Sequence, residues 1–322
     1  MNGLLLFNSE AGDGNAKRLN ELQAELQPAD VWEFGSGEDM AELAELPARA
    51  AATPGRYVAV AGGDGTVESV AAALVGSDLT LGVIPCGTYN NFAKNLDLPH
   101  EIPEACRIIR EGHTCLIDAG RVNGKIFFES VGMGLDAELF PAGERIKAGE
   151  VAQWQEVFAK AHRFRRTQFR LSFPAAIRDL VEKNDLVRGR SLRHLMRSDA
   201  KQVTLKSLLI IVSNTTLYGA NFAIAPGQQP DDGKLTITVF LRHNKFRLWL
   251  HYLTIAFRKN TPTTDVLVLR SASLKVEADG FVPVHLDGDT IETSPDQKAL
   301  KIECVHKVLR VFAPASKRTE DL

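Results

Sequence analysis

The sequence predicts two domains: an N-terminal α/β domain and a C-terminal domain that is mainly antiparallel β. Its 322 residues exceed the size of a typical single domain. Strand-like apolar runs alternate with helix-like runs over roughly the first 115 residues, the order typical of a parallel α/β sheet. Beyond that point strand-like runs follow one another, and the first two are joined by Asn123-Gly124, a strong hairpin signal.

The N-terminal elements are predicted from apolar periodicity and from Gly and Pro breaks. Leu4 to Phe7 is an apolar run of the length expected for a buried strand, and leucines at helical spacing follow it. Pro54-Gly55 ends the second helix-like run. We expect strands at residues 4–7, 57–61 and 79–84, and helices at residues 16–26, 36–52, 67–75, 90–96 and 102–110.

The C-terminal domain is predicted from a series of short apolar runs. We expect strands at residues 116–122, 125–131, 205–213, 234–241, 266–269, 274–278, 282–286, 300–305 and 308–312. The α/β domain is therefore placed at residues 1–117, completed by residues 308–322 as the chain returns. The β-rich, sandwich-like domain is placed at residues 118–307, with a basic helical insertion at about 141–203, where Val151, Trp154 and Phe158 have helical spacing.

Charge is distributed unevenly along the chain. The net charge of −2 implies no general attraction to nucleic acid. Residues 160–206, however, contain 13 Lys and Arg but only 4 Asp and Glu. This segment is either a solvated basic face or a contact for anionic lipid headgroups, which attract basic residues by about 1 kcal/mol each. Because no signal-peptide pattern or membrane-spanning apolar run is found, we expect a cytoplasmic protein that is peripheral to the membrane.

The run Gly62-Gly63-Asp64-Gly65-Thr66 lies between a strand-like and a helix-like segment. A glycine turn at a helix N-terminus aims several backbone N–H groups at one point, where phosphate oxygens are their natural partners. A carboxylate beside a phosphate repels it unless a cation or a proton transfer is involved, so Asp64 suggests Mg²⁺ or base chemistry. The alternative is a tight turn in which Asp64 is only the helix N-cap.

A second glycine run, Gly132-Met133-Gly134-Leu135-Asp136-Ala137, matches the G-x-G-x-x-A pattern of dinucleotide-binding folds. In those folds the pattern lies in the first βαβ unit. Here it follows a predicted hairpin, so we do not expect a nicotinamide or flavin site at this position.

Several motifs recur in a fixed order along the chain. The glycine turn is followed by Pro85-Cys86-Gly87-Thr88-Tyr89-Asn90-Asn91-Phe92-Ala93, and then by Asp118-Ala119-Gly120 with Asn123-Gly124. Farther on come Tyr218-Gly219, Ala225-Pro226, Asp231-Asp232-Gly233-Lys234-Leu235 and Asp287-Gly288-Asp289. This ordered set, which covers nearly the whole chain, resembles the diacylglycerol kinase catalytic family, including bacterial lipid kinases and the sphingosine and ceramide kinases. The glycine turn alone is less specific, since NAD kinases and phosphofructokinases have a similar one.

The resemblance implies an ATP-binding domain similar to those of NAD kinase and phosphofructokinase. It also implies Mg²⁺-dependent transfer of the ATP γ-phosphate to a hydroxyl of diacylglycerol, a sphingoid base or a related lipid. Such transfer needs phosphate positioning, Mg²⁺ and a proton acceptor. The residues expected to hold or border the nucleotide are Asn8, Gly12, Gly62, Gly63, Asp64, Gly65, Thr66, Glu68 and Thr88.

The resemblance assigns further roles to acidic residues. Asp289, which stands where the family has Glu, would be the general base, and Asp287 could share that role. Asp64 and Asp118 would join an acidic network near the transferred phosphate. The carboxylate of Asp232 and the main-chain carbonyls of Gln229 and Lys234 would match a Mg²⁺ site that looks structural rather than catalytic.

Two residues depart from the family pattern. Asp13 stands where the first loop usually has a basic residue, for which Lys17 or Lys94 are candidate replacements. Asp289 is one methylene, about 1.5 Å, shorter than Glu, and catalysis is sensitive to misplacement on that scale. A soluble-metabolite kinase of the NAD kinase type, and a non-catalytic nucleotide- or lipid-binding module, therefore stay open as alternatives. A homodimer also stays open.

Overall fold

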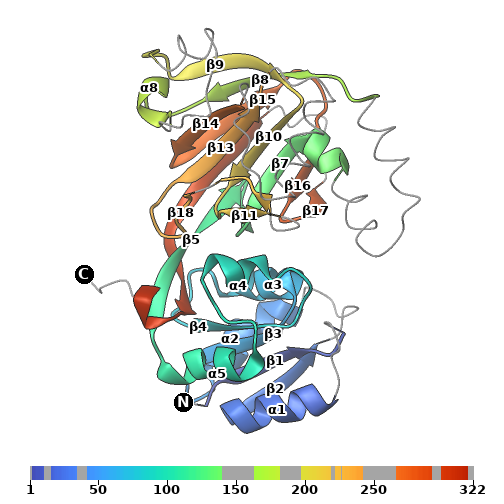
Figure 1. The fold of residues 1–322 in the computed structure, drawn as a ribbon, viewed down its shortest axis with the longest axis vertical. Helices are drawn as coiled ribbons and strands as arrows, with labels where there is room; N and C mark the ends of the chain where they lie inside the picture. Colours follow the sequence, from blue (N-terminus) through green and yellow to red (C-terminus); the bar gives the residue numbers. More distant parts are fainter. Residues whose placement is uncertain are drawn as a thin grey trace. The chain divides into compact units, whose positions relative to one another are not determined.

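The computed structural model describes residues 2–10, 16–34, 42–139, 163–181, 197–218, 222–225, 227–241, 266–291 and 299–317. The chain forms two compact units (Figure 1). Unit 1 comprises residues 1–119, 230–232 and 305–322, and unit 2 comprises residues 120–229 and 233–304. Two long strands, β5 (Thr114–Val122) and β18 (Ala299–Phe312), contribute residues to both units.

Unit 1 is built on a parallel sheet. In the order of pairing its strands are β2 (Asp30–Phe34), β1 (Leu4–Asn8), β3 (Tyr57–Gly62), β4 (Thr80–Pro85) and the C-terminal part of β18. All of these pairings are parallel. Strands β1 and β3 are buried along their whole length, which explains their continuously apolar sequences.

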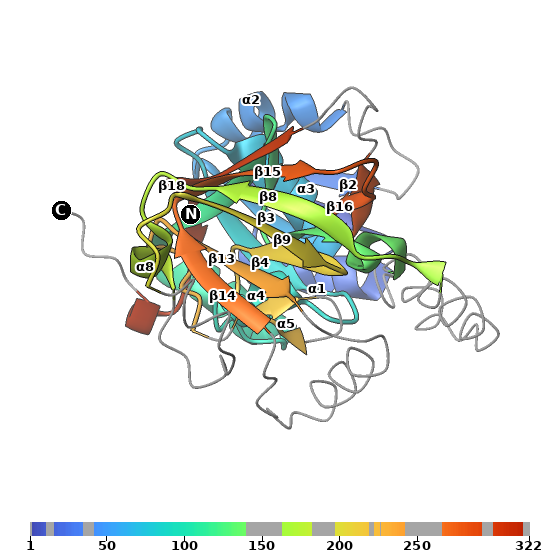
Figure 2. The ribbon, with the colours of Figure 1, turned by 90° about the horizontal axis from the view of Figure 1, so that it is seen from above.

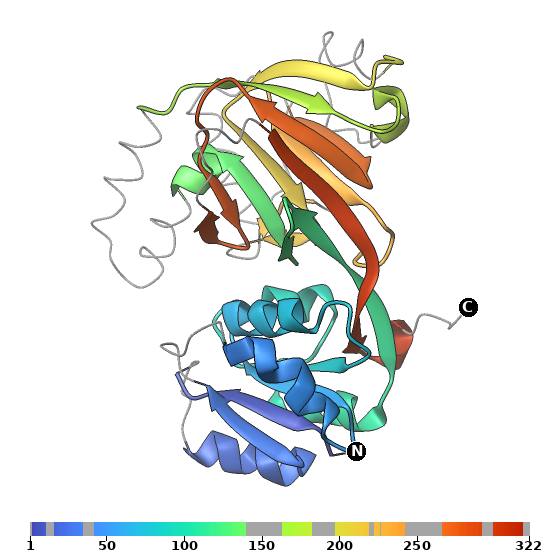
Figure 3. The same cartoon turned by 180° about the vertical axis from the view of Figure 1, so that it is seen from behind.

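Helices cover both faces of this sheet (Figure 1 and Figure 3). Helix α1 (Ala16–Leu26) packs against α5 (Ile102–Glu111) on one face. On the other face α3 (Asp64–Leu74) contacts α2 (Leu46–Ala51), α4 (Asn91–Asn95) and the 3₁₀ turn η1 (Glu42–Glu45). A second 3₁₀ turn, η2 (Ala315–Lys317), follows β18. The expected helix at 67–75 begins three residues early because Gly63 is its N-cap.

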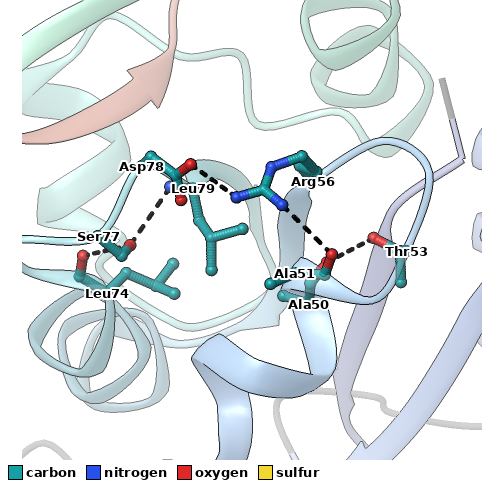
Figure 4. Close-up of polar contacts among 8 residues, drawn as sticks. All are labelled: Ala50, Ala51, Thr53, Arg56, Leu74, Ser77, Asp78 and Leu79. Carbon is teal, nitrogen blue, oxygen red and sulfur yellow. Dashed lines mark hydrogen bonds and ion pairs between the residues drawn. The ribbon is translucent and has the colours of Figure 1, made fainter.

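Polar contacts close the loops that lead into the N-terminal ends of β3 and β4. Figure 4 shows the residues concerned, which are Ala50, Ala51, Thr53, Arg56, Leu74, Ser77, Asp78 and Leu79. The Thr53 hydroxyl donates to the last turn of α2, and the Ser77 hydroxyl donates to the last turn of α3, each at 2.7 Å. Arg56 forms an exposed ion pair with Asp78 at 2.6 Å. Ligands of open α/β sheets bind at the carboxyl ends of the strands, so this edge is opposite to the expected site.

Unit 2 is a sandwich of two largely antiparallel sheets. One sheet has the order β14 (Val266–Ser271), β13 (Leu235–Phe240), β10 (Leu209–Ser213), β7 (Ser130–Gly134), β16 (Val284–Leu286) and β17 (Asp289–Ile291). The other contains β9 (Gln202–Ser207), β8 (Thr167–Ser172), β15 (Ser273–Ala278), the N-terminal part of β18, and the hairpin of β5 with β6 (Lys125–Phe127). Figure 2 shows β15, β8 and β9 side by side.

The core of unit 2 lies between its two sheets. Phe169 and Leu171 of β8 and Ile302 of β18 join the same buried cluster as Ile210 of β10 and Ile237 of β13. Three short elements lie outside the main sheets: α8 (Ile177–Leu180), β11 (Leu217–Tyr218) and β12 (Phe222–Ala223). The predicted combination of an α/β part and a mainly antiparallel β part is confirmed.

Several local predictions for the β-rich part are wrong. Residues 167–172, expected within a basic helical insertion, form strand β8, because Phe169 and Leu171 alternate with residues that face outward. The expected strand at 205–213 is divided between β9 and β10, which belong to different sheets. The two strands expected at 300–305 and 308–312 are one strand, β18, which contains Lys307 at a φ of +50°. Residues 140–162 and 182–196 of the expected insertion lie outside the described residues.

The Asn123-Gly124 hairpin is present, with positive φ at both residues, as a tight two-residue turn requires. Its second strand is shorter than expected. Strand β6 ends at Phe127, and the residues from Ser130 onward form β7 in the other sheet.

Candidate active site

The glycine turn joins the C-terminal end of β3 to the N-terminus of α3. Gly63 is the extended N-cap residue, and the first helical hydrogen bond runs from Val67 N–H to the Gly63 carbonyl at 3.0 Å. The N–H groups of residues 64–66 therefore have no acceptor inside the helix. A Cβ at Gly62 would lie only 2.9 Å from the Thr66 Cβ, so this tight turn requires glycine there. The arrangement is that of an anion-binding helix terminus.

Asp64 has a different role from the one that the N-cap alternative gives it. Its carboxylate bonds the backbone N–H groups of Asn90, Asn91 and Phe92, the last at 3.1 Å. Burial raises the pKa of Asp64, while these N–H bonds and the charge of Lys94 oppose the rise. Although Asp64 belongs to α3, its side chain therefore binds the N-terminus of α4 and ties the glycine turn to the Pro85–Ala93 motif. The N-cap alternative is wrong, because Gly63 occupies that position.

The same two motifs also touch through their backbones. The Cys86 N–H donates to the Gly62 carbonyl at 2.8 Å. A Cβ on Gly87 would lie 2.6 Å from the Gly63 Cα, closer than real Cβ contacts allow. The side chain of Asn90, whose φ is +52°, closes the loop by accepting from Gly87 N–H and donating to the Gly87 carbonyl at 2.9 and 2.8 Å.

Other residues of the expected nucleotide site lie near the carboxyl ends of β1 and β4. The Asn8 amide donates to the Thr66 hydroxyl at 2.8 Å, so the end of β1 contacts the first turn of α3. Glu68 is half-buried on α3, and Thr88 is exposed in the loop between β4 and α4. Gly12 and Asp13 lie outside the described residues.

Sequence analysis missed Arg18 on α1. Its charge favours the thiolate of Cys86, in the second motif, although burial dominates and raises the pKa of that thiol. Lys94, which acts on Asp64, is a second cation of the same unit. The only available signal for Arg18 was its place in the first turn of the helix that follows the β1 loop. Lys17, the other candidate, is exposed.

Asp118 is fully buried on β5 in unit 1. Its carboxylate accepts the Lys307 N–H at 2.7 Å and contacts His306 Nδ1 at 2.8 Å. Its own N–H donates to the Pro230 carbonyl at 2.6 Å. Asp118 therefore connects Lys307, the residue of β18 with positive φ, to the segment of residues 230–232. Its expected place in a catalytic acidic network stays a prediction.

Asp287 and Asp289 lie at the hairpin between β16 and β17. Asp287 and Gly288 form the two-residue turn, with φ of +46° and +98°. The Asp287 carboxylate accepts three backbone N–H groups, from Phe128 at 2.7 Å, Glu129 at 2.9 Å and Ser130 at 2.8 Å. Burial raises the pKa of Asp287 to about 6, and the three N–H donors oppose that rise.

Asp289 differs from the other three acids, because it is exposed at the start of β17. The carboxylates of Asp64, Asp118 and Asp287 all accept backbone N–H groups and hold loops in place. The hairpin forms a tight β-turn, and the Asp287 carboxylate anchors it. Asp289 is the one acid of this set that the fold presents to solvent.

The expected metal loop brings two main-chain oxygens to one point. The carbonyls of Gln229 and Lys234 both accept from the Gln228 side-chain amide, at 2.7 and 2.8 Å. Within the described ranges no group of three His, Cys, Asp or Glu side chains could hold a metal ion. Main-chain carbonyls are hard-oxygen donors that suit Mg²⁺ or Ca²⁺, and the contribution of the Asp232 carboxylate to this set stays a prediction. Gln228, which sequence analysis missed, orients both carbonyls.

Comparison with known families gives two matches. Residues 2–122 match the family described as "Diacylglycerol kinase catalytic domain". Residues 146–313 match the family described as "YegS C-terminal NAD kinase beta sandwich-like domain". The chain belongs to the diacylglycerol kinase catalytic family. The predicted resemblance is therefore confirmed, and the family makes the protein a kinase.

Relatives of this kinase agree with that assignment. The diacylglycerol kinase of Mycobacterium tuberculosis is 28% identical over 293 residues, covering 88% of this chain and 85% of its own. A solved structure of a candidate diacylglycerol kinase from Bacillus anthracis is 21% identical, with a TM-score of 0.72 over 98% of this chain and 96% of its own. Yeast NADH kinase, at 7% identity, has a TM-score of 0.54 over 99% of this chain and 84% of its own. The two structures show a shared fold, and the last one supports the expected likeness to NAD kinase.

No helix among the described residues of this kinase is both long and apolar enough to cross a bilayer.

Proposed function

We propose that this kinase transfers the γ-phosphate of ATP to a hydroxyl of diacylglycerol, a sphingoid base or a related lipid, with Mg²⁺. ATP binding is supported by the N-terminus of α3, whose first N–H groups have no acceptor inside the helix. The close spacing of Gly63 and Gly87 and the hydrogen bond between Asn8 and Thr66 hold this turn in place. Such a terminus binds phosphate through oriented N–H groups. The lipid part is supported by the family and by the relatives' names.

The roles of the chain's own residues follow from their places. The N–H groups of residues 64–66 hold phosphate oxygens, and Arg18 and Lys94 add positive charge on that side of unit 1. Asp289 takes the proton of the lipid hydroxyl, because it is the exposed acid of the family motif. ATP would supply the phosphoryl group, and Mg²⁺ bound with it would neutralise charge on the phosphates. The Gln229 and Lys234 carbonyls with Asp232 would hold a second, structural cation.

The test is labelling from [γ-³²P]ATP of vesicles that contain diacylglycerol, sphingosine or ceramide, with NAD as a soluble acceptor. We expect Asp289→Asn to lower lipid labelling by about a hundredfold or more, the usual effect of losing a general base. Asp289→Glu restores the family's side-chain length and should keep or raise the rate. Asp279→Asn removes an exposed carboxylate from another loop of unit 2 and is the matched control.

Three results would count against the proposal. Full labelling by Asp289→Asn would move the base to Asp287 or Asp64. Labelling of NAD alone would favour a soluble-metabolite kinase. ATP binding without labelling of any acceptor would favour a binding module.

We further propose that the kinase reaches its lipid at an anionic membrane surface. Arg163, Arg165 and Arg166 are exposed immediately before β8, within the basic segment 160–206. Co-sedimentation with phosphatidylglycerol vesicles should weaken as salt is raised, because surface charges are screened. Absence of binding at low salt would contradict this contact.

A further inference from the structure

The hairpin that carries Asp289 also contributes one member of a buried histidine–aspartate pair. His285 on β16 is completely buried, and its Nε2 lies 2.8 Å from Asp136 Oδ2. Asp136, only 6% exposed, belongs to the helical turn at residues 135–139 that follows β7. Strands β16 and β7 are paired, with His285 opposite Gly132.

The pair explains the glycine run that resembled a dinucleotide motif. A Cβ on Gly132 would lie 2.1 Å from both Asp136 Oδ2 and His285 Nε2. Gly134, with φ of +83°, turns the chain from β7 into the helical turn that bears Asp136. The two glycines thus make room for the pair and bring Asp136 to it, which is a use of G-x-G-x-x-A unrelated to a cofactor.

The hydrogen bonds of His285 fix its tautomer. The backbone N–H of Gly288 donates to His285 Nδ1 at 3.3 Å, so Nδ1 is the unprotonated ring nitrogen. The ring proton therefore lies on Nε2 and is donated to Asp136. The imidazole links Asp136 on one side to the backbone of the Asp287-Gly288 turn on the other.

This turn is consequently held at both of its residues. Asp287 is anchored through its side chain to the N–H groups of residues 128–130. Gly288 is anchored through its N–H to the imidazole. Asp289 is the next residue and pairs with Leu286 across the hairpin. The direction of its carboxylate therefore depends on the backbone angles at Gly288, whose φ is +98°.

We propose that His285 is a positioning residue: held by Asp136, it fixes the Gly288 peptide and thereby aims the Asp289 carboxylate. The inference rests on the proposed function, since it assigns His285 to the same proton transfer. A purely structural role explains the pair less well, because buried polar pairs are often replaced by apolar residues without loss of stability. A site that must hold an acid within about 0.5 Å has a reason to keep such a pair.

Two substitutions separate the two hydrogen bonds of His285. In His285→Gln the side-chain amide nitrogen reaches the place of Nε2 and can donate to Asp136, but the acceptor for Gly288 is lost. In His285→Asn the side-chain oxygen takes the place of Nδ1 and can accept from Gly288, but the contact with Asp136 is lost. Val276→Ala, in the sandwich core on β15, is a control that lowers stability without touching the hairpin.

The kinetic readout is lipid phosphorylation with diacylglycerol in phosphatidylglycerol vesicles. We expect His285→Gln to lower kcat at least tenfold with the KM for ATP unchanged. His285→Asn should keep kcat within about threefold of the native value, and Val276→Ala should keep both constants. Native kcat in His285→Gln, or an equal loss in Val276→Ala, would overturn the proposal.

A second readout does not depend on activity. Hydrogen exchange of the Gly288 amide, followed by NMR, should be at least tenfold faster in His285→Gln than in the native protein, and near native in His285→Asn. If the native protein labels no lipid, the proposed function fails, but faster exchange in His285→Gln still supports the contact that holds the turn. Unchanged exchange in His285→Gln would overturn that contact whatever the activity.

Discussion

The glycine turn of unit 1 and the β16–β17 hairpin of unit 2 use the same device in different ways. In each, an aspartate accepts backbone N–H groups from a segment far away in sequence: Asp64 from residues 90–92 and Asp287 from residues 128–130. The rest of the support differs. The glycine turn depends on backbone shape, because Gly63 and Gly87 approach too closely for a Cβ on Gly87. The hairpin depends on side chains, namely Asp287 and the His285–Asp136 pair.

The difference predicts how each region fails. A region fixed by close backbone contact should be damaged by adding one methyl group at the contact. A region fixed by ionisable side chains should respond to their protonation.

The largest effect is expected from Gly87→Ala. Its new Cβ would lie 2.6 Å from the Gly63 Cα, so the two motifs must separate. We expect about a hundredfold weaker ATP binding, or about 2.7 kcal/mol, by calorimetry. The matched variant is Gly63→Ala, whose Cβ meets the Gly87 Cα at an ordinary 3.5 Å and whose φ of −85° suits alanine. Equal losses in both variants would contradict a steric origin.

An effect on stability rather than on ATP binding, with a pH signature, is expected from Asp287→Asn. Burial raises the pKa of Asp287 to about 6 in the folded state, above the value of roughly 3.9 for an unfolded aspartate. Between these values the folded protein binds more protons than the unfolded one, so the contribution of this group to stability falls as pH rises. It is complete below pH ~4 and lost by about pH 6.

The test compares urea unfolding of the native protein and Asp287→Asn at several pH values between 4 and 7. Asparagine tolerates the positive φ of this position and stays neutral. We expect the variant to gain roughly 3 kcal/mol of unfolding free energy relative to the native protein as pH rises through this window. A shift in the opposite direction would mean that the three N–H donors outweigh burial and lower the pKa instead.

The same contrast explains which parts of the molecule the sequence could predict. Strands β1, β3 and β4 and the glycine turn were recognisable because local rules govern them: buried parallel strands are continuously apolar, and tight turns need glycine. Strand β8 was missed because its alternating Phe169 and Leu171 lie within a highly basic segment, and only the opposite sheet explains why they are buried. Strand β2 was missed because its edge position leaves it only partly buried.

The candidate site divides in the same way. The family motifs indicated Asp64, Asp118, Asp287 and Asp289, but not what each carboxylate contacts. That Asp64 binds the start of α4, and that Asp287 binds residues 128–130, depends on contacts between segments 28 and about 160 residues apart. His285 belongs to no motif used in the prediction. Only its burial against Asp136 and Gly132 makes it visible.

The smallest effect is expected at the edge of the sheet opposite the glycine turn. Asp78 pairs with Arg56 there, but the two side chains are 76% and 50% exposed (Figure 4). Exposed pairs contribute about 0–1 kcal/mol, because water and salt screen them. Asp78→Asn should therefore change the free energy of unfolding by less than about 1 kcal/mol and leave ATP binding unchanged. The contrary result would be that Asp78→Asn weakens ATP binding as much as Gly87→Ala does. That result would mean that the N-terminal ends of the strands also affect nucleotide binding, and it would contradict the view that backbone contacts at the carboxyl ends determine it.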